Sequence, residues 1–240
     1  MKKLGMLLIG LVLAAGVFAA QPKVLVFYKT AAFHHASIAK GLEAIYKLGV
    51  ENGFQVDSTK DAAAFTNDNL KQYAAIIFLS TTGTLFDASQ QQALQQYVHN
   101  HGGIVGIHAA ADAEYEWPWY NKLIGAWFLN HPKQQTATLD VVDRRNGATR
   151  HLPAKWTRKD EWYNYKDINK DLHVLITLDE KSYEGGKNGD FHPIAWYHNF
   201  EGGRVFYTGL GHTDESYSDP LFLNHLLGGI RYAMGAGKKK

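Results

Sequence analysis

Val24-Leu25-Val26-Phe27-Tyr28 is a continuous apolar run of β-branched and aromatic residues, and it predicts a strand buried on both faces, as in a parallel sheet. Four apolar residues then recur at helical spacing: Ile38, Leu42, Ile45 and Leu48. This pattern stops at Asn52-Gly53, a pair typical of the end of a helix. A strand followed by a helix is the start of a βαβ series.

The same alternation continues over the first half of the chain. Residues 74–79 and 103–107 are two further apolar runs that predict buried strands. Between them, Asp87 and Gln90 have the spacing of a capping box at the start of a helix that reaches His101-Gly102. The sequence therefore predicts an α/β fold with a doubly wound, mostly parallel sheet.

The pattern changes after Trp117. Residues 120–129 are predicted to be helical, whereas residues 136–142 alternate between apolar and polar side chains, as a more exposed strand does. We expect insertions and antiparallel strands in this region. Residues 204–208 predict another core strand, and residues 220–234 predict a closing helix.

The N-terminus has the features of a secretory signal peptide. Lys2 and Lys3 precede an apolar run over residues 4–17, and cleavage is expected near Ala19 or Ala20. The apolar run is short for a membrane span, so we expect an exported protein, periplasmic or extracellular, that does not associate with a membrane in its mature form. The expected division is a signal peptide over 1–20, one domain over 21–236 and a basic tail over 237–240.

The composition excludes several classes of function. The chain has no cysteine, so thiol catalysis, thiolate metal sites and disulfide bonds are excluded. It has 25 basic and 23 acidic residues, and removal of Lys2 and Lys3 with the signal peptide makes the two numbers equal. A chain without net charge argues against nucleic acid and anionic membranes as partners. Any chemistry must therefore come from carboxylates and from the 12 histidines.

Histidines follow three of the predicted strands. His34 and His35 come after the first strand, His108 directly follows residues 103–107, and His212 follows the strand near residue 208. Ligands of open parallel sheets bind beyond the carboxyl ends of the strands, so these side chains are expected to converge. His108 stands in the small-residue setting of a nucleophile elbow, where an imidazole serves as a base, an acid or a metal ligand. The neighbouring glycines could instead serve only the close packing of a strand.

Asp160-Glu161 precede Trp162-Tyr163, and a carboxylate beside aromatic surface has a raised pKa that suits a general acid. Adjacent residues of a strand point apart, so only one of the two carboxylates can enter a site. The alternative is a solvated acidic turn. His131-Pro132 and His192-Pro193 add two histidines on a restricted backbone, each of which could also be an ordinary loop residue.

Tryptophans crowd residues 117–127 and recur at positions 156, 162 and 196. Such rings can stack on the apolar face of a pyranose, although core packing accounts for part of them. Residues 185–190 lack the order of a phosphate loop and predict a turn, so no nucleotide cofactor is expected.

Several motifs, in this order, resemble those of the ThuA-like family, named for trehalose utilisation, whose fold is similar to the class I glutamine amidotransferase domain. They are residues 34–37, 102–108, 119–132, 160–163, 192–196 and 203–212. The resemblance covers nearly the whole mature chain, and it implies a flavodoxin-like sheet with helices on both faces and a role around sugars or keto-sugars. His108 stands where the amidotransferases have their cysteine nucleophile, so glutamine hydrolysis is not expected.

We therefore expect an enzyme of sugar metabolism that acts on a disaccharide, glycoside or keto-sugar by acid/base or metal-assisted chemistry, with a small-molecule sugar as its partner. The alternatives are a non-catalytic carbohydrate-binding protein and a zinc-dependent hydrolase. The expected cofactor is a divalent metal such as zinc. The catalytic candidates are His108, Glu161, His212 and Asp160. The substrate-binding candidates are His34, His35, Trp119, Tyr120, Trp162, His192 and Trp196. The candidate metal ligands are His108, His131 and His212.

Overall fold

The computed structural model describes residues 20–235. The predicted signal peptide, apart from Ala20, and the predicted basic tail lie outside these residues. Within the described range, no helix combines the length and apolar character that crossing a membrane requires.

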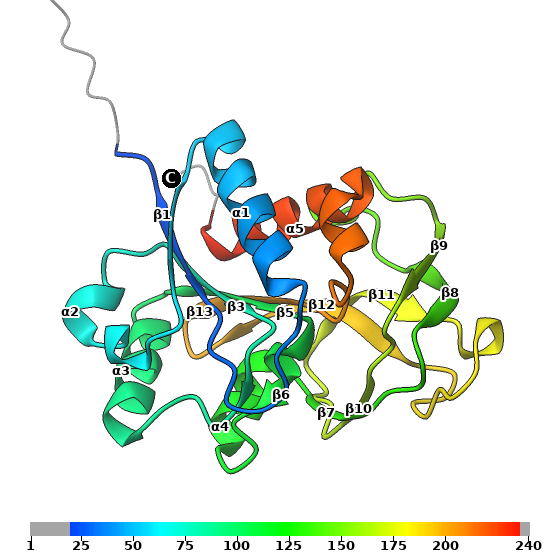
Figure 1. The fold of residues 1–240 in the computed structure, drawn as a ribbon, viewed down its shortest axis with the longest axis horizontal. Coiled ribbons are helices and arrows are strands. Elements are labelled where there is room, and N and C mark those ends of the chain that lie inside the picture. Colours follow the sequence, from blue (N-terminus) through cyan, green and yellow to red (C-terminus); the bar gives the residue numbers. More distant parts are fainter. Residues whose placement is uncertain (1–19, 236–240) are drawn as a thin grey trace, which may run out of the picture.

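A nine-stranded sheet forms the centre of the molecule (Figure 1). Its strands are β1 (Lys23–Phe27), β2 (Gln55–Thr59), β3 (Ala75–Leu79), β5 (Gly103–Ile107), β8 (Gln135–Val141), β9 (Lys155–Asp160), β11 (His173–Leu178), β12 (Pro193–Phe200) and β13 (Gly203–Thr208). The order across the sheet is β2-β1-β3-β5-β13-β12-β11-β8-β9. The first five strands run parallel, in the flavodoxin-like order, and the last four are added antiparallel. The predicted α/β class and mostly parallel sheet are confirmed.

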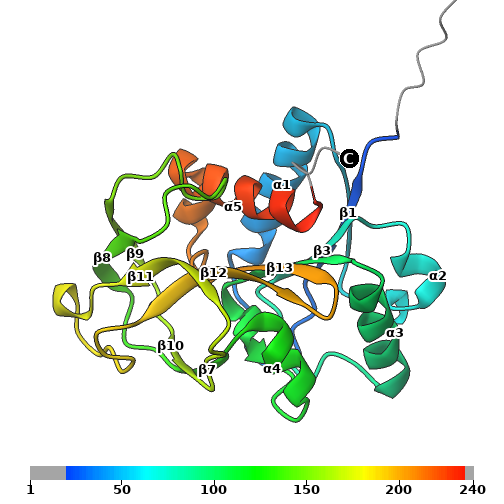
Figure 2. The ribbon, with the colours of Figure 1, turned by 180° about the vertical axis from the view of Figure 1, so that it is seen from behind.

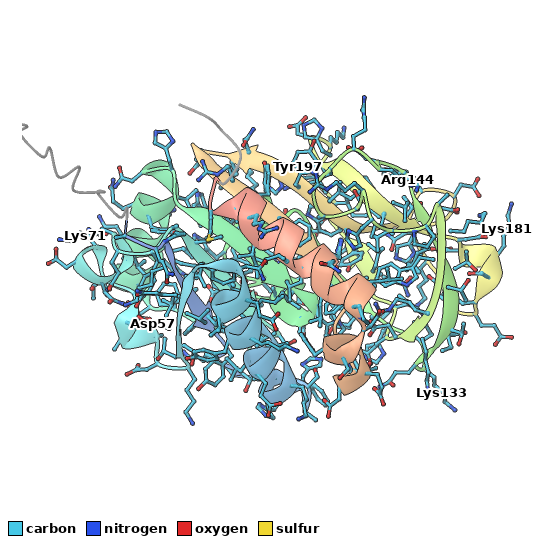
Figure 3. The ribbon with its side chains drawn as sticks, turned by 90° about the horizontal axis from the view of Figure 1, so that it is seen from above. Asp57, Lys71, Lys133, Arg144, Lys181 and Tyr197 are labelled. Atoms are coloured by element: carbon cyan, nitrogen blue, oxygen red, sulfur yellow. The ribbon has the colours of Figure 1, made fainter. Side chains whose placement is uncertain are left out.

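Helices cover both faces of this sheet. The helices are α1 (Ile38–Asn52), α2 (Asn67–Leu70), α3 (Ala88–His99), α4 (Pro118–Ile124) and α5 (Pro220–Ala233). Seen from the front and from behind, α1 and α5 lie on one face and α3 and α4 on the other (Figures 1 and 2). Figure 3, seen from above, shows α1 and α5 side by side across the parallel strands. This arrangement leaves the carboxyl ends of the parallel strands free for a site.

The local signals in the first half of the chain act as predicted. Every residue of β3 and β5 is buried, as an apolar strand between two helical layers should be. The helix α1 ends at Gly53, whose φ of 73° requires the left-handed conformation that glycine adopts without strain. Asp87 and Gln90 form the expected capping box of α3.

The predicted helix over residues 120–129 is wrong in its second half. The helix α4 ends at Ile124, because Gly125 takes a φ of 109° and stops it. Residues Trp127–Asn130 form the strand β7 instead, paired antiparallel with β10 (Asn164–Lys166). Helical spacing of apolar residues could not show this pairing, because the partner strand lies more than thirty residues further along the chain. Two short strands, β4 (Thr82–Gly83) and β6 (Asp112–Ala113), also pair beside the sheet.

Two buried histidines, His198 and His225, make the stability of this fold depend on pH. Burial lowers the pKa of each to about 4, whereas the unfolded chain protonates both near pH 6.5. Their contribution is therefore complete above pH 6.5 and is lost as the pH falls from 6.5 toward 4. We expect a loss of roughly 2 kcal/mol per histidine between pH 7 and pH 5, measured as the free energy of unfolding in urea.

The variant His225→Gln provides the comparison. Nδ1 of His225 lies 2.8 Å from the carbonyl oxygen of Ala148, and a glutamine amide can donate to the same oxygen without titrating. The variant should therefore lose less stability between pH 7 and pH 5 than the unchanged protein. An equal loss in both proteins would contradict the assignment to His225.

Candidate functional site

Four ionisable side chains from distant parts of the chain meet beyond the parallel strands. His35 follows β1, His108 follows β5, Glu161 follows β9 and His212 follows β13. Each offers one nitrogen or oxygen atom, and these four atoms lie within 4.8 Å of one another. Three of the residues are buried and His212 is half-buried. We call these four residues the His/Glu cluster, a group that could hold a metal ion.

His108 reaches the cluster through a strained turn at the end of β5. Its φ is 49°, in the left-handed region that residues with a Cβ rarely adopt. The hydroxyl of Tyr207 donates a 2.7 Å hydrogen bond to the carbonyl oxygen of His108 and holds this turn. Nδ1 of His108 lies 2.9 Å from the carbonyl oxygen of Gly209. Because a carbonyl oxygen only accepts, Nδ1 carries a hydrogen and donates it to Gly209, and Nε2 faces the cluster.

Glu161 brings the negative charge of the cluster. Its Oε2 lies 3.1 Å from Nδ1 of His212 and 3.4 Å from Nε2 of His108. These two nitrogens are 3.0 Å apart. The other carboxylate oxygen, Oε1, lies 3.3 Å from Nδ1 of His131, whose side chain is 41% exposed. Both oxygens of Glu161 therefore face histidine nitrogens.

The pKa of Glu161 differs from the expectation. Burial raises it, but the facing nitrogens of His108 and His212 outweigh burial and hold the pKa well below its usual range. The expected raised pKa is therefore wrong, because the carboxylate points at imidazoles and not at the aromatic surface that follows it in the sequence. An ionised carboxylate suits a metal ligand and does not suit a general acid.

Asp160 does not join the cluster. Its carboxylate is fully buried and accepts hydrogen bonds from the backbone N–H groups of Gly211 and His212, both at 3.1 Å. Nη2 of Arg158 pairs with it at 3.2 Å. As expected for neighbours at the end of a strand, the two carboxylates point apart: Glu161 enters the cluster, and Asp160 holds the loop that carries His212.

His35 completes the cluster from the loop between β1 and α1. Its ring lies 4.8 Å from that of His108 and 5.2 Å from that of His212, nearly perpendicular to both. Its Nδ1 is buried and has no hydrogen-bond partner among the described residues. Burial, together with the neighbouring histidines, lowers the pKa of His35 to about 3. A buried neutral imidazole with an unpaired nitrogen is unusual unless something else binds that nitrogen.

An aromatic wall of Tyr163, Phe128 and His131 stands beside the cluster. The Tyr163 ring lies 4.3 Å from that of His108 and 4.2 Å from that of Phe128. The ring of His131 stacks on Tyr163 at 6.0 Å. Phe128 lies on β7, and the other two residues flank the β7–β10 pair, so this small insertion builds one side of the site.

Comparison with protein families gives a match over most of the chain. The family model described as ThuA, trehalose utilisation, matches residues 23–233. The chain belongs to the ThuA family. The resemblance seen in the motifs is thus confirmed, and the family description places the protein in sugar metabolism. A search of curated proteins gave no match.

Solved structures agree with the ThuA assignment. A protein from Bacteroides uniformis described as ThuA-like is 31% identical, with 90% of this chain and 93% of that chain covered and a TM-score of 0.77. A second ThuA-like protein, from Parabacteroides merdae, is 20% identical over 92% of both chains, with a TM-score of 0.73. A β-galactosidase from Bacillus circulans shares the fold alone, at 13% identity, with 90% of this chain and 31% of that chain covered and a TM-score of 0.60.

The ThuA fold brings His35, His108 and His212 together and places the other candidate histidines elsewhere. His34 is exposed, with Nδ1 3.2 Å from the hydroxyl oxygen of Thr30. Of the four residues of the cluster, His131 approaches Glu161, at Oε1, and it is not one of the potential ligands, whose third histidine is His35 and not the expected His131. His192 is fully buried, and its Nε2 lies 2.8 Å from the carbonyl oxygen of Tyr163. His192 therefore holds the backbone of Tyr163, a residue of the aromatic wall.

The candidate aromatic residues also lie away from the cluster. Trp119 donates a 2.8 Å hydrogen bond from its indole nitrogen to Glu201 at the surface. Tyr120, Trp162 and Trp196 are fully buried, and each donates to a backbone carbonyl oxygen at 2.8 to 3.0 Å. Their rings fill the core, so they offer no face to a ligand. Tyr163 and Phe128 supply the aromatic surface beside the cluster instead.

Sequence reasoning missed Tyr163 and Asp112. Tyr163 belongs to the 160–163 motif, but the substrate-binding candidate from that motif is its neighbour Trp162. Asp112 follows His108 by four residues, and burial raises the pKa of its carboxyl. The hydroxyl of Tyr115 donates a 2.6 Å hydrogen bond to it. The spacing of four residues between His108 and Asp112 could have indicated that Asp112 lies near the site, because residues His108–Ala111 form a helical turn.

A groove of about 650 Å³ is lined by side chains of α1 and α5, and no residue of the His/Glu cluster lines it. The cluster itself is largely enclosed, with side-chain exposures of 8% for Glu161 and 14% for His212. A ligand would reach the cluster from the side of His131 and His212.

Proposed function

We propose that this ThuA protein is an exported, metal-dependent enzyme that acts on a disaccharide, glycoside or keto-sugar, and that the His/Glu cluster holds a divalent cation such as zinc. The observation that carries the proposal is the convergence of three histidines and one carboxylate within 4.8 Å in a largely buried setting. The description of the family as trehalose utilisation supports a sugar as the substrate class.

The separations within the cluster fit a metal. Zinc ligands lie at about 2.0–2.1 Å in a tetrahedral arrangement, which places neighbouring ligand atoms roughly 3.3 Å apart. The separations among Nε2 of His108, Nδ1 of His212 and Oε2 of Glu161 are 3.0, 3.1 and 3.4 Å. His35, a member of the cluster, also has a buried Nδ1 without a hydrogen-bond partner among the described residues. Imidazole and carboxylate donors suit zinc and its first-row neighbours.

The surroundings of the cluster give further support. Ligating histidines usually donate their second N–H to a carbonyl or carboxylate, which fixes the ring, and His108 does so to Gly209. Asp160 holds His212 differently, by accepting a hydrogen bond from its backbone N–H. Burial of the Asp160 charge would be costly if the loop that carries His212 served packing alone.

The chemistry then follows from the donor set. A divalent metal at this position would act as a Lewis acid toward a carbonyl or hydroxyl oxygen of the sugar. Three of the four residues would suffice as protein ligands of a catalytic zinc ion, which would leave one position for water or a sugar oxygen. Glu161 balances part of the cationic charge, and His131 stands at its outer oxygen, at the more exposed side of the site.

The test is turnover with and without a chelator. The full chain, secreted by its host and purified without an affinity tag, is incubated with a panel of disaccharides and their keto derivatives, and changes in mass and optical rotation are followed together. We expect conversion of at least one sugar, a fall of about 10²-fold or more after metal removal, and recovery with zinc. Sugar binding without conversion would favour the carbohydrate-binding alternative, and conversion unaffected by metal removal would contradict the metal.

A further inference from the structure

The hydroxyl of Tyr163 is a further polar atom at the site, besides Nδ1 of His35, that lacks a hydrogen-bond partner among the described residues. It makes no hydrogen bond to any residue in the described range 20–235, although the residue is only 2% exposed. It is also absent from the polar atoms that are sealed from solvent and unpaired, so the small exposed part of the residue includes this oxygen. A nearly buried tyrosine usually finds a partner for its hydroxyl. An unpaired hydroxyl that remains accessible is available to a ligand.

The ring of Tyr163 lies beside the cluster. It is 4.3 Å from the ring of His108, and Glu161 precedes it by two residues. Phe128 and His131 pack on the same ring. An accessible hydroxyl on this ring is therefore within reach of a ligand that binds at the cluster.

The backbone of Tyr163 is held by buried polar groups. Nε2 of His192 lies 2.8 Å from the Tyr163 carbonyl oxygen, and Nδ1 of the same ring lies 2.7 Å from Oε1 of Glu180. His192 is fully buried, and such a buried histidine and carboxylate pair is costly unless its position matters. The arrangement resembles the way in which Asp160 holds His212. The backbone of Tyr163 and that of His212 are thus each held by a buried polar side chain, His192 and Asp160.

We infer that Tyr163 is a catalytic residue whose hydroxyl donates a hydrogen bond to a sugar oxygen bound at the His/Glu cluster. The inference rests on the proposed function and adds the Tyr163 hydroxyl as a group that would contact the substrate. An uncharged donor fits an electron-rich acceptor, such as the carbonyl oxygen of a keto-sugar or a hydroxyl oxygen that gains negative charge during the reaction. The tyrosine can take this role without rearrangement, because its hydroxyl has no hydrogen bond to give up within residues 20–235.

The variant Tyr163→Phe tests this directly, since it removes only an oxygen that makes no internal hydrogen bond. We expect unfolding midpoint and zinc affinity to stay the same, and kcat on the converted sugar to fall about 10²-fold, as on removal of one donor to a developing negative charge. The dissociation constant for trehalose, measured by calorimetry on the zinc-loaded chain, should rise about tenfold if trehalose binds. The control is Tyr46→Phe, which removes a hydroxyl bonded to Ser58 at the surface.

The possible outcomes distinguish a failure of the Tyr163 inference from a failure of the proposed function. A zinc-loaded protein that converts a sugar equally well with Tyr163→Phe, within about twofold in kcat, overturns the inference and leaves the proposed function intact. Reduced zinc affinity or a lower unfolding midpoint in Tyr163→Phe would give the hydroxyl a structural role and also overturn it. An unchanged protein that neither binds nor converts any sugar of the panel overturns the proposed function and the inference with it.

Discussion

Replacement of His108 by asparagine is expected to lower turnover by about 10³-fold or more and to abolish stabilisation by zinc. Asparagine tolerates the left-handed backbone at φ 49°, so the turn after β5 can survive the change. The variant loses the Nε2 atom that lies 3.0 Å from His212 and 3.4 Å from Glu161. The measurements are kcat/KM and the thermal midpoint with and without zinc.

The size of the zinc effect on the unchanged protein can be stated in advance. Zinc at one hundred times its dissociation constant stabilises a folded protein by about 2.7 kcal/mol, which corresponds to roughly 5–10 °C in a domain of this size. The matched control is His99→Asn, since His99 lies at the surface with its Nε2 2.7 Å from Glu201. A zinc shift in His108→Asn as large as that of the control would count against the site.

Replacement of Glu161 by glutamine is expected to reduce turnover by about 10²-fold or more while the protein stays folded. The amide keeps the shape of the side chain but removes the only negative charge among three imidazoles. Without it, the cluster binds a divalent cation more weakly, and the metal that would polarise the substrate oxygen is held less well. Turnover at saturating and at limiting zinc separates weaker metal binding from slower chemistry.

Glu201→Gln is the control for this change. Glu201 is a surface residue that pairs with His99 and accepts the indole N–H of Trp119, so its amide should leave turnover unchanged. If Glu161→Gln and Glu201→Gln behaved alike on the sugar that the panel identifies, Glu161 would have no part in the reaction. Histidine would then have to account for the chemistry alone.

The convergence of three histidines could be predicted because it follows from the parallel sheet. Apolar runs locate β1, β5 and β13, and parallel neighbours bring their carboxyl ends together. His35, His108 and His212 follow those ends, and they meet there. The choice between His34 and His35 could not be made, because loop residues next to each other face opposite sides and only the fold decides which one is buried.

The remaining parts of the site depend on antiparallel additions that leave little trace in a single sequence. Glu161 follows β9 at the far edge of the sheet, and it reaches the cluster because Asp160 docks on the loop after β13. The pairing of β7 with β10 fixes Tyr163 and His131, whereas the spacing of apolar residues predicts helix over residues 127–129. The sequence also could not show which tryptophans are exposed. Trp162 and Trp196 are residues of the type that stacks on sugars, but both are fully buried and belong to the core.

The metal content of the purified chain is the most direct test of whether the His/Glu cluster holds a zinc ion. The full chain is stripped with a chelator, equilibrated with a slight excess of zinc, freed of unbound metal by gel filtration and analysed by inductively coupled plasma mass spectrometry. We expect one zinc ion per chain in the unchanged protein and in His99→Asn. We expect almost none in the double variant His108→Asn, His212→Asn, whose folding is checked by circular dichroism. An unchanged protein that retains no zinc, or a folded double variant that retains as much zinc as the unchanged protein, would rule out a metal site at the His/Glu cluster.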